Sequence, residues 1–311
     1  MAQPLLVSAA ALFNEQGQVL IAKRPLGSDQ GGLWEFPGGK LAPYETGLQA
    51  LRREIQEELG VEIQGARPLI KIHYTYPDKT VLLDVWRVQQ FSGEPWGKEG
   101  QAIRWVSVRE LSQFEFPAAN RAIIRAVQLP EDYMITGDFA DQSEALLRLQ
   151  AALERGVRLV QLRAHHLDAE AYRQLAQSAL EACKKAGASL MLNADPALLD
   201  QVDAAGIHLT GARLMAARKR PVPVGKWLGA SCHDAASLQQ AERVGADLVT
   251  LSPVQATASH PGQAALGWQN FQNLVNGALM PVYALGGLGP EDKNRVFGLG
   301  AQGVAGISRY W

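Results

Sequence analysis

Three glutamates crowd one side of a predicted helix in the first third of the chain. The stretch from Gly38 to Val61 reads GGKLAPYETGLQALRREIQEELGV, and Glu57 and Glu58 lie three and four residues after Glu54. Side chains at these spacings share a helix face, where like charges repel. Mg²⁺ and Mn²⁺ take oxygen ligands and are commonly bridged to substrate phosphates, so such a cation would relieve the repulsion. The pattern therefore indicates metal-assisted chemistry on a phosphate.

The alternative interpretation is an ordinary solvated helix whose acidic face is stabilised by ion pairs four residues apart. That interpretation does not account for the FPGGK turn in front of the helix or for Glu45 near its start. Gly60 is expected to end the helix. The apolar stripe that predicts the helix consists of Leu48, Leu51, Ile55 and Leu59.

The spacing of this stretch resembles the Nudix box at every fixed position of that motif. The family is defined by a long pattern of glycines, glutamates and one arginine, so the resemblance is specific. In chain order the matching positions are Gly39, Glu45, Arg53-Glu54-Ile55, Glu57-Glu58 and Gly60-Val61.

The Nudix resemblance implies an α/β/α sandwich around a mixed sheet, which hydrolyses a nucleoside diphosphate linked to another group. It also implies a metal site. Arg53 and Glu45 would orient the loop and the helix rather than contact substrate. The implied metal ligands are the carboxylates of Glu54, Glu57 and Glu58 and the carbonyl oxygen of Gly38, and one glutamate would also serve as the base.

Two stretches outside the box resemble MutT-type 8-oxo-dGTP diphosphatases. GEPWGKEGQ, residues 93–101, supplies Glu99, which the resemblance makes a further metal ligand or base; otherwise this stretch is a polar hairpin loop. FPAAN, residues 116–120, supplies Asn120, whose amide can donate and accept and so can match the O6 and N7–H edge of 8-oxoguanine. Without the resemblance, Asn120 is equally an N-cap or an early helix residue.

The same resemblance assigns the remaining substrate contacts. Arg24 and Lys40 would hold phosphates, Phe36 would line the base pocket, and Lys79 occupies a place where the family often has an arginine near the nucleotide. The implied reaction uses Mg²⁺, with Mn²⁺ as a possible substitute. It converts 8-oxo-dGTP, and also dGTP, to the nucleoside monophosphate and pyrophosphate, which removes a mutagenic precursor from the nucleotide pool.

With 311 residues, the chain is long enough for two domains. We expect a Nudix domain over residues 1–129 and a second domain over 130–311, with the boundary at Pro130. In the first domain the strand candidates are residues 5–13 and 18–24, which flank a hairpin signal, then 81–91 and 102–108. A second helix is expected from about Ala118 to Leu129.

From Tyr133 onward, eight short apolar runs alternate with amphipathic segments, which predicts a (β/α)₈ TIM barrel. The predicted strands are residues 133–136, 157–163, 188–193, 206–210, 227–232, 247–252, 281–287 and 303–308.

This second part resembles thiamine phosphate synthase and its TenI relatives over about residues 133–309, through stretches such as VQLR, GIHL and ALGGL. Such barrels bind phosphate at the glycine-rich turns after their last two strands. The resemblance therefore implies a phosphate or thiazole phosphate ligand. The backbone N–H groups offered to it would belong to Gly286, Gly287, Gly306 and Ile307.

The barrel also departs from its family. Asn193 lacks the aspartate that should follow it, HLTGARL lacks a second aspartate, and AHH and TASH replace stretches that carry lysines. Without the two aspartates the means of holding Mg²⁺ on a pyrophosphate are lost, so we expect a degenerate barrel. Histidines near strand ends could transfer protons or could be polar loop residues; they are His165, His166, His233 and His260.

The composition limits the partners. The net charge of −1 excludes a broad electrostatic attraction to a nucleic acid polymer or to an anionic membrane. Two distant cysteines, Cys183 and Cys232, form no disulfide framework, and neither a leader nor an apolar span is evident, so a cytoplasmic protein is expected.

Two rival functions stay open at this point. The Nudix chemistry could act on a pyrophosphate of the thiamine pathway, which would rationalise the fusion to the barrel. Alternatively the Nudix domain could be a ligand sensor, which would be expected to show a decayed box and an added DNA-binding segment.

Overall fold

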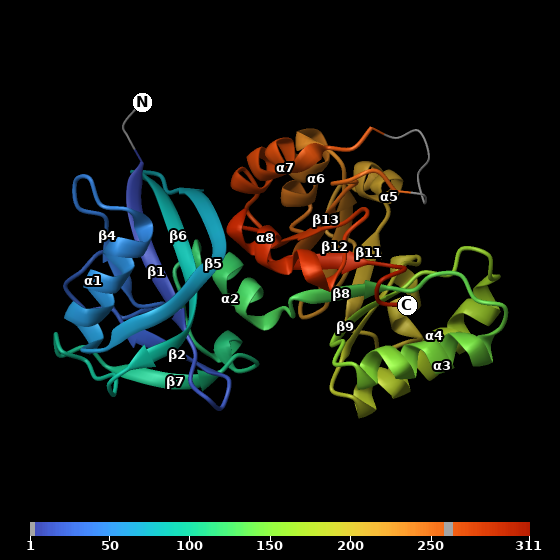
Figure 1. Cartoon of the computed structure of the whole chain (residues 1–311), viewed down its shortest axis with the longest axis horizontal. Coiled ribbons are helices and arrows are strands. Elements are labelled where there is room, and N and C mark those ends of the chain that lie inside the picture. The colour runs from blue at the N-terminus through green and yellow to red at the C-terminus, as the bar shows by residue number, and fades with distance from the viewer. Residues whose placement is uncertain (1–3, 258–263) are drawn as a thin grey trace. The chain divides into compact units, whose positions relative to one another are not determined.

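The computed structural model describes residues 4–257 and 264–311. The chain divides into two compact units, one formed mainly by residues up to Gln128 and the other mainly by residues from Leu129 onward (Figure 1). The domain limits 1–129 and 130–311 stay a prediction. Within the described ranges, no helix is long and apolar enough to cross a membrane.

The first unit contains two small sheets. A mixed four-stranded sheet has the order β4-β1-β6-β5, in which β1 and β6 are parallel and the other neighbours are antiparallel. An antiparallel three-stranded sheet has the order β3-β2-β7. In chain order these strands are β1 (Leu5–Leu12), β2 (Gln18–Lys23), β3 (Trp34–Glu35), β4 (Gly38–Lys40), β5 (Glu62–Thr75), β6 (Thr80–Ser92) and β7 (Ile103–Ser107).

The hairpin expected between the first two strands is largely wrong. A single antiparallel bridge joins Phe13 to Val19, and then β1 and β2 enter different sheets. Both edges of β1 are already occupied, since β4 pairs on one side and β6 on the other. Since β4 pairs with residues 7–9 of β1, β2 joins this strand only at the single bridge beyond its end.

Two helices cover opposite faces of the strands, as the α/β/α sandwich requires. Successive residues of β1 point to opposite faces: Ala9, Ala11 and Phe13 belong to one buried cluster, and Ala10 and Leu12 to another. Helix α1 (Gly47–Leu59) contributes to the second cluster, and helix α2 (Asn120–Gln128) to the first.

Helix α1 has defined ends. Thr46 and Gln49 form a capping box at its start, and Gly60 ends it in the left-handed conformation, with φ 71°. The residues that the helix buries are Ala50, Leu51, Ile55 and Leu59. The predicted helix and its stop are thus confirmed, while Leu48 is only partly buried.

The second unit is a closed parallel barrel, and all eight predicted strands are present in it. They are β8 (Asp132–Ile135), β9 (Leu159–Leu162), β10 (Ser189–Leu192), β11 (Gly206–Leu209), β12 (Trp227–Cys232), β13 (Leu248–Leu251), β14 (Val282–Ala284) and β15 (Gly303–Gly306). Its helices are α3 (Gln142–Glu154), α4 (Ala169–Lys185), α5 (Gly211–Ala216), α6 (Ala235–Arg243), α7 (Gly267–Asn276) and α8 (Lys293–Gly298). A short 3₁₀ turn, Pro196–Asp200, takes the place of a helix between β10 and β11.

A chain of polar side chains crosses the barrel interior. Gln161 Nε2 donates to the Tyr133 hydroxyl over 3.3 Å, and that hydroxyl lies within hydrogen-bond distance of His208 Nδ1, 3.0 Å away. His208 Nε2 lies 3.1 Å from the Ser231 hydroxyl. Burial lowers the pKa of His208 from 6.5 to about 3. The ring is therefore neutral in the folded protein.

This buried neutral histidine predicts a pH-dependent stability. Between pH 6.5 and about 3 the unfolded state binds a proton at His208 that the folded state excludes. Stability should therefore fall with decreasing pH across this window, by about 1.4 kcal/mol per pH unit at most. His208→Gln should reduce this slope, as measured by urea denaturation of the full chain at several pH values. An unchanged slope would contradict the assignment.

Candidate active site

Two glycines bring strand β4 against its neighbours. A Cβ atom on Gly38 would lie 2.1 Å from the Ser8 carbonyl oxygen, and the φ of Gly38 is 148°. A Cβ atom on Gly39 would lie 2.2 Å from the carboxylate carbon of Glu54. Only glycine fits at position 38, where the neighbours are backbone atoms, whereas a Cβ atom at position 39 would displace the Glu54 carboxylate. The turn thus lies close against the face of α1 that carries the glutamates.

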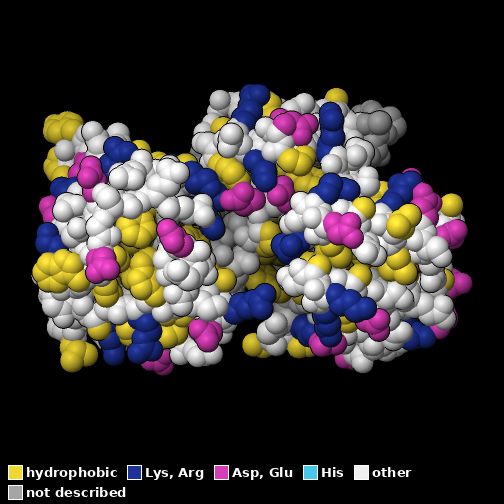
Figure 2. Space-filling model, turned by 60° about the horizontal axis from the view of Figure 1, so that its bottom comes forward, with side chains coloured by type: hydrophobic (Ala, Val, Ile, Leu, Met, Phe, Trp, Pro, Cys, Tyr) yellow, Lys and Arg dark blue, Asp and Glu magenta, His cyan; other side chains and the backbone are white. Residues whose placement is uncertain are grey.

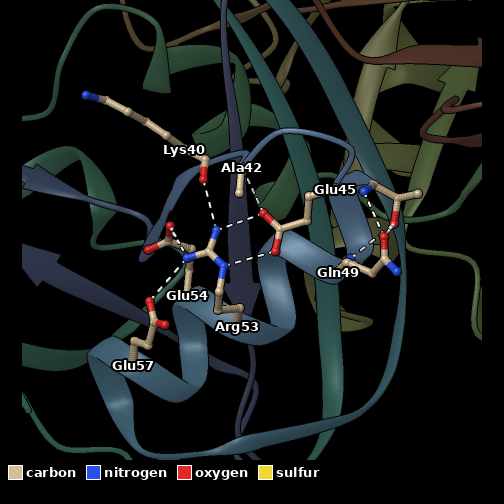
Figure 3. A network of polar contacts seen from close by, with 8 residues as sticks. Lys40, Ala42, Glu45, Gln49, Arg53, Glu54 and Glu57 are labelled. Carbon is tan, nitrogen blue, oxygen red and sulfur yellow. Dashed lines mark hydrogen bonds and ion pairs between the residues drawn. The ribbon is translucent and has the colours of Figure 1, made fainter.

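Arg53 connects this turn to the helix (Figure 3). Its Nε and Nη2 donate to the two carboxylate oxygens of Glu45 over 2.9 and 2.8 Å, a bidentate pair. Nη1 donates to Glu54 over 2.7 Å and to Glu57 over 3.1 Å, and Nη2 also donates to the Lys40 carbonyl oxygen over 3.1 Å. These carboxylates raise the pKa of Arg53 above its ordinary value.

This network relieves part of the repulsion expected among the three glutamates. Arg53 neutralises part of the cluster from within the motif. The arrangement agrees with the orienting role that the resemblance gave to Arg53 and Glu45. Sequence spacing could have indicated the contact with Glu57, which lies four residues further along the helix.

Glu58 has a different environment from the other two helix glutamates. Its Oε2 accepts a hydrogen bond from the Gly38 N–H group over 3.1 Å. Burial raises the pKa of Glu58 to about 8; the Gly38 hydrogen bond opposes this, and the charges of Glu35, Glu54 and Glu99 add to it. Negative charge from three other carboxylates therefore converges on Glu58.

The described residues provide the oxygen ligands that a hard divalent cation prefers. Within 4–257 and 264–311, however, no three His, Cys, Asp or Glu side chains are already gathered as a metal site. Glu54 and Glu57 are turned toward Arg53 instead. The Glu57 side chain is 56% exposed and can leave that ion pair at little cost. The residues thus fit a cation by chemistry, once Glu57 is released.

Two of the expected substrate-binding cations already have carboxylate partners: Arg24, expected to hold a phosphate, and Lys79, expected near the nucleotide. Arg24 is paired with Glu35, and its Nε donates to the Asp29 carbonyl oxygen over 2.9 Å. Lys79 is paired with the Asp29 carboxylate. Asp29 thus lies between Arg24 and Lys79, and a substrate phosphate would compete with it. The sequence argument did not single out Asp29 or Glu35.

Lys40 is exposed, and its side chain extends away from the Arg53 network in Figure 3. Its carbonyl oxygen accepts a hydrogen bond from Arg53. The backbone of Lys40 is fixed while its ammonium group is left to solvent, an arrangement suited to an anionic ligand.

An aromatic wall and a buried amide come from separate segments. Phe36 is 3% exposed and stacks on Phe116, with ring centroids 5.8 Å apart and an interplanar angle of 24°. Asn120 is the first residue of α2 and is 8% exposed. Its side chain makes no hydrogen bond with the described residues, so it does not cap the helix.

The barrel turns lie where the sequence placed them. Gly286 and Gly287 follow β14 with positive φ values of 109° and 70°, and Ile307 follows Gly306 at the end of β15. Among the parts of the chain that the structure describes, the N–H groups of Gly286, Gly287 and Ile307 have no hydrogen-bond partner. A phosphate site there stays a prediction.

The histidines of the barrel differ in their surroundings. His165 and His166 are exposed in the loop after β9, and His233 follows β12 with its Nδ1 2.8 Å from the Ser252 carbonyl oxygen. His260 lies outside the described residues. Asn193 follows β10, and its Nδ2 donates to the His208 carbonyl oxygen.

Comparison with known proteins matches each unit to a family. A family model described as NUDIX domain matches residues 8–126, and one described as thiamine monophosphate synthase matches residues 132–310. An 8-oxo-dGTP diphosphatase of Escherichia coli K12 is 38% identical over 120 residues, which are 39% of this chain and 93% of that protein.

Two further proteins are similar to this chain, one to each unit. A CTP pyrophosphohydrolase of the same organism is also 38% identical, over 117 residues, which are 38% of this chain and 87% of that protein. A putative thiamine-phosphate synthase 2 of Aquifex aeolicus is 35% identical over 185 residues, which are 59% of this chain and 99% of that protein.

In the first unit, an arginine joins a glutamate-bearing helix to a glycine turn within an α/β/α sandwich, which is the arrangement of a pyrophosphohydrolase. A closed parallel barrel follows it in the same chain. The chain belongs to the Nudix family through its first unit and to the thiamine monophosphate synthase family through its second. It is an enzyme of the Nudix pyrophosphohydrolase class.

The close approach of Gly39 to Glu54 gives a direct test of the site. Gly39→Ala would place a methyl group 2.2 Å from the Glu54 carboxylate and so displace it. We expect turnover to fall about tenfold or more, because small misplacements of reacting groups are costly, while the melting temperature changes little. Gly27→Ala is the matched control, since nothing lies within 4 Å of that Cβ. Equal activity of the two variants would contradict the arrangement.

Proposed function

We propose that the first unit hydrolyses 8-oxo-dGTP, and also dGTP, to the nucleoside monophosphate and pyrophosphate. The observation that carries this substrate is the Asn120 side chain, which is largely buried and whose amide makes no hydrogen bond with the described residues. The amide atoms are not sealed from solvent, so a ligand can reach both the donor and the acceptor of the amide. A guanine-type edge, which presents both an acceptor and a donor, would satisfy it.

The aromatic wall supports the same substrate. Phe36 stacks on Phe116 and belongs to the same buried cluster as Ala119, which directly precedes α2, and Ile123, in the first turn of α2. A purine placed against this wall would bring its edge toward the α2 N-terminus. The substrate is therefore recognised by apolar contact with the ring and by hydrogen bonds to the base edge.

The relatives do not settle the base. Proteins named 8-oxo-dGTP diphosphatase and CTP pyrophosphohydrolase are equally similar to this chain. Both names describe hydrolysis of a nucleoside triphosphate, so the chemistry is common to them and the base pocket decides between them. Our choice of the oxidised purine rests on Asn120.

The catalytic roles follow from the environments of the glutamates. We assign metal binding to the carbonyl oxygen of Gly38 and to Glu54, Glu57, Glu58 and Glu99. A bound Mg²⁺ or Mn²⁺ supplies charge neutralisation of the pyrophosphate and activation of water. Burial and neighbouring carboxylates raise the pKa of Glu58 to about 8 in the site without metal, and a bound cation would favour its charged form.

The chain's own residues prepare the substrate for this attack. Arg24, Lys40 and Lys79 would bind the phosphates, for which Arg24 and Lys79 must exchange their present partners Glu35 and Asp29. Water adds to a phosphorus of the α–β linkage, the bridging P–O bond breaks, and the proton of the water passes to a carboxylate. Arg53 keeps the turn and the helix in register throughout.

A pyrophosphate of the thiamine pathway is the second candidate. The observation that favours it is the fused barrel, whose family model is described as thiamine monophosphate synthase. We propose that this barrel is a degenerate module that binds phosphate or a thiazole phosphate at Gly286, Gly287, Gly306 and Ile307. The described surface in Figure 2 shows acidic and basic side chains interspersed, which does not favour a nucleic acid polymer as partner.

A substrate comparison separates the candidates. The full chain with Mg²⁺ is offered 8-oxo-dGTP, dGTP, CTP, thiamine diphosphate and hydroxymethylpyrimidine diphosphate, and kcat/KM should be highest for 8-oxo-dGTP. Asn120→Ala should raise KM for 8-oxo-dGTP roughly tenfold or more, through lost hydrogen bonds, and change KM for CTP much less. A preference for either thiamine compound would overturn the nucleotide assignment.

Glu57 tests the metal assignment, because its side chain is held by an exposed ion pair with Arg53. Glu57→Gln keeps an acceptor for Arg53, so folding should be intact, while Mg²⁺-dependent turnover should fall at least about 100-fold. Glu62→Gln, on an exposed position of β5, is the control and should retain activity. Near-normal turnover of Glu57→Gln would exclude Glu57 as a ligand.

A further inference from the structure

The loop of residues 93–101, which carries Glu99, is bound to the C-terminal end of α1. The Trp96 N–H group donates to the Leu59 carbonyl oxygen over 3.1 Å, and the Lys98 N–H group donates to the Glu58 carbonyl oxygen over 3.0 Å. The Lys98 ammonium group donates to the Gln56 carbonyl oxygen over 3.1 Å. These carbonyl groups belong to the last turn of the helix, where a cation is favoured; that of Gln56 also accepts the Gly60 N–H group.

The loop is also tightly wound. A Cβ atom on Gly97 would lie 1.9 Å from the Gln101 carbonyl oxygen, and Gly100 has a φ of 80°. The Gly100 N–H group donates to the Gly97 carbonyl oxygen over 3.0 Å. Glu99 thus sits at the tip of a glycine-flanked turn, and its own side chain is exposed.

Gln101 closes this turn against the helix with both ends of its carboxamide. Its Oε1 accepts from the Glu99 N–H group over 2.9 Å, and its Nε2 donates to the Glu58 carbonyl oxygen over 3.0 Å. The Glu58 carbonyl oxygen therefore receives two hydrogen bonds from the loop, one from Lys98 and one from Gln101. One side chain thus connects the backbone of Glu99 to the backbone of Glu58.

We propose that Gln101 is a positioning residue that holds Glu99 at the active site by joining its backbone to that of Glu58. The inference rests on the proposed function, in which Glu99 and Glu58 act on the same metal-bound pyrophosphate. Gln101 itself contacts neither the substrate nor the reacting atoms; both of its hydrogen bonds go to backbone atoms.

The physical reason is the freedom of the turn without this contact. Glycines at 97 and 100 give the backbone around Glu99 wide conformational freedom. Ordering such a backbone costs conformational entropy. The hydrogen bonds of Gln101 order the turn before the substrate binds, so the Glu99 carboxylate does not have to be brought to Glu58 in every catalytic cycle. The loss of Gln101 should therefore lower kcat and leave KM for the nucleotide nearly unchanged.

A double-mutant cycle tests the proposal in the full-length protein. Gln101→Ala should reduce kcat for 8-oxo-dGTP with Mg²⁺ by about 10- to 100-fold, and Glu99→Gln should reduce it at least as much. In the Glu99→Gln background, Gln101→Ala should cause little further loss, because the group that it positions is already gone. Gln64→Ala, an exposed glutamine on β5, is the matched control.

A second readout does not depend on turnover. Amide hydrogen exchange of residues 96–101 in the metal-free protein should be faster in Gln101→Ala than in the parent, while exchange within α1 stays unchanged. This separates a local positioning role from general destabilisation.

The outcomes are distinguishable. If Glu99→Gln lowers kcat but Gln101→Ala does not, the positioning role is overturned and the proposed function stands. If the two losses multiply in the double variant, Gln101 acts independently of Glu99 and the inference is overturned. If Glu99→Gln has no effect, the assigned role of Glu99 fails, and the inference fails with it.

Discussion

The Nudix site depends on one guanidinium group. Arg53 binds Glu45 in front of its helix, Glu54 beside it and Glu57 one turn further, and it also holds the carbonyl oxygen of Lys40. A flexible ammonium group could not make these planar contacts at once. Arg53 thus fixes the turn, the start of the helix and two helix glutamates relative to one another.

The two units differ in how their buried polar side chains are paired. In the first unit, the negative charges of Glu35, Glu54 and Glu99 surround Glu58 and raise its pKa, so a cation would be stabilised there. In the barrel, Gln161, Tyr133, His208 and Ser231 form a chain in which donors face acceptors and the histidine is neutral. The first arrangement favours binding of a charged ligand, and the second favours a well-ordered core.

Much of the architecture could be predicted from the sequence, because it depends on local patterns. The stripe and stop glycine of α1 and the eight barrel strands are each encoded within a few residues, and the structure confirms them. The strand β5 was not predicted, since its register shifts near Gly65 and Pro68 interrupt the alternation. The pairing of β1 failed because it depends on β4 and β6, which are distant in the sequence.

The candidate site shows the same division between local and distant information. The motif located the glutamates and Arg53, whose contacts within the helix follow from spacing. The partners of Arg24 and Lys79 could not be foreseen, because Asp29 reaches Lys79 across 50 positions of the chain. Likewise, no pattern showed that the Gln101 carboxamide would join the backbone of Glu99, two positions before it, to that of Glu58, 43 positions before it.

The contacts that hold the turn before α1 are made largely to its backbone. Glu58 takes the Gly38 N–H group, Arg53 takes the Lys40 carbonyl oxygen, and Glu45 takes the Ala42 N–H group over 2.8 Å. Tyr44, which completes the turn, is fully exposed. These contacts thus depend on the main chain of the turn rather than on its side chains. Evolution is therefore free to vary the residues between Gly39 and Glu45 for substrate preference without disturbing the catalytic framework.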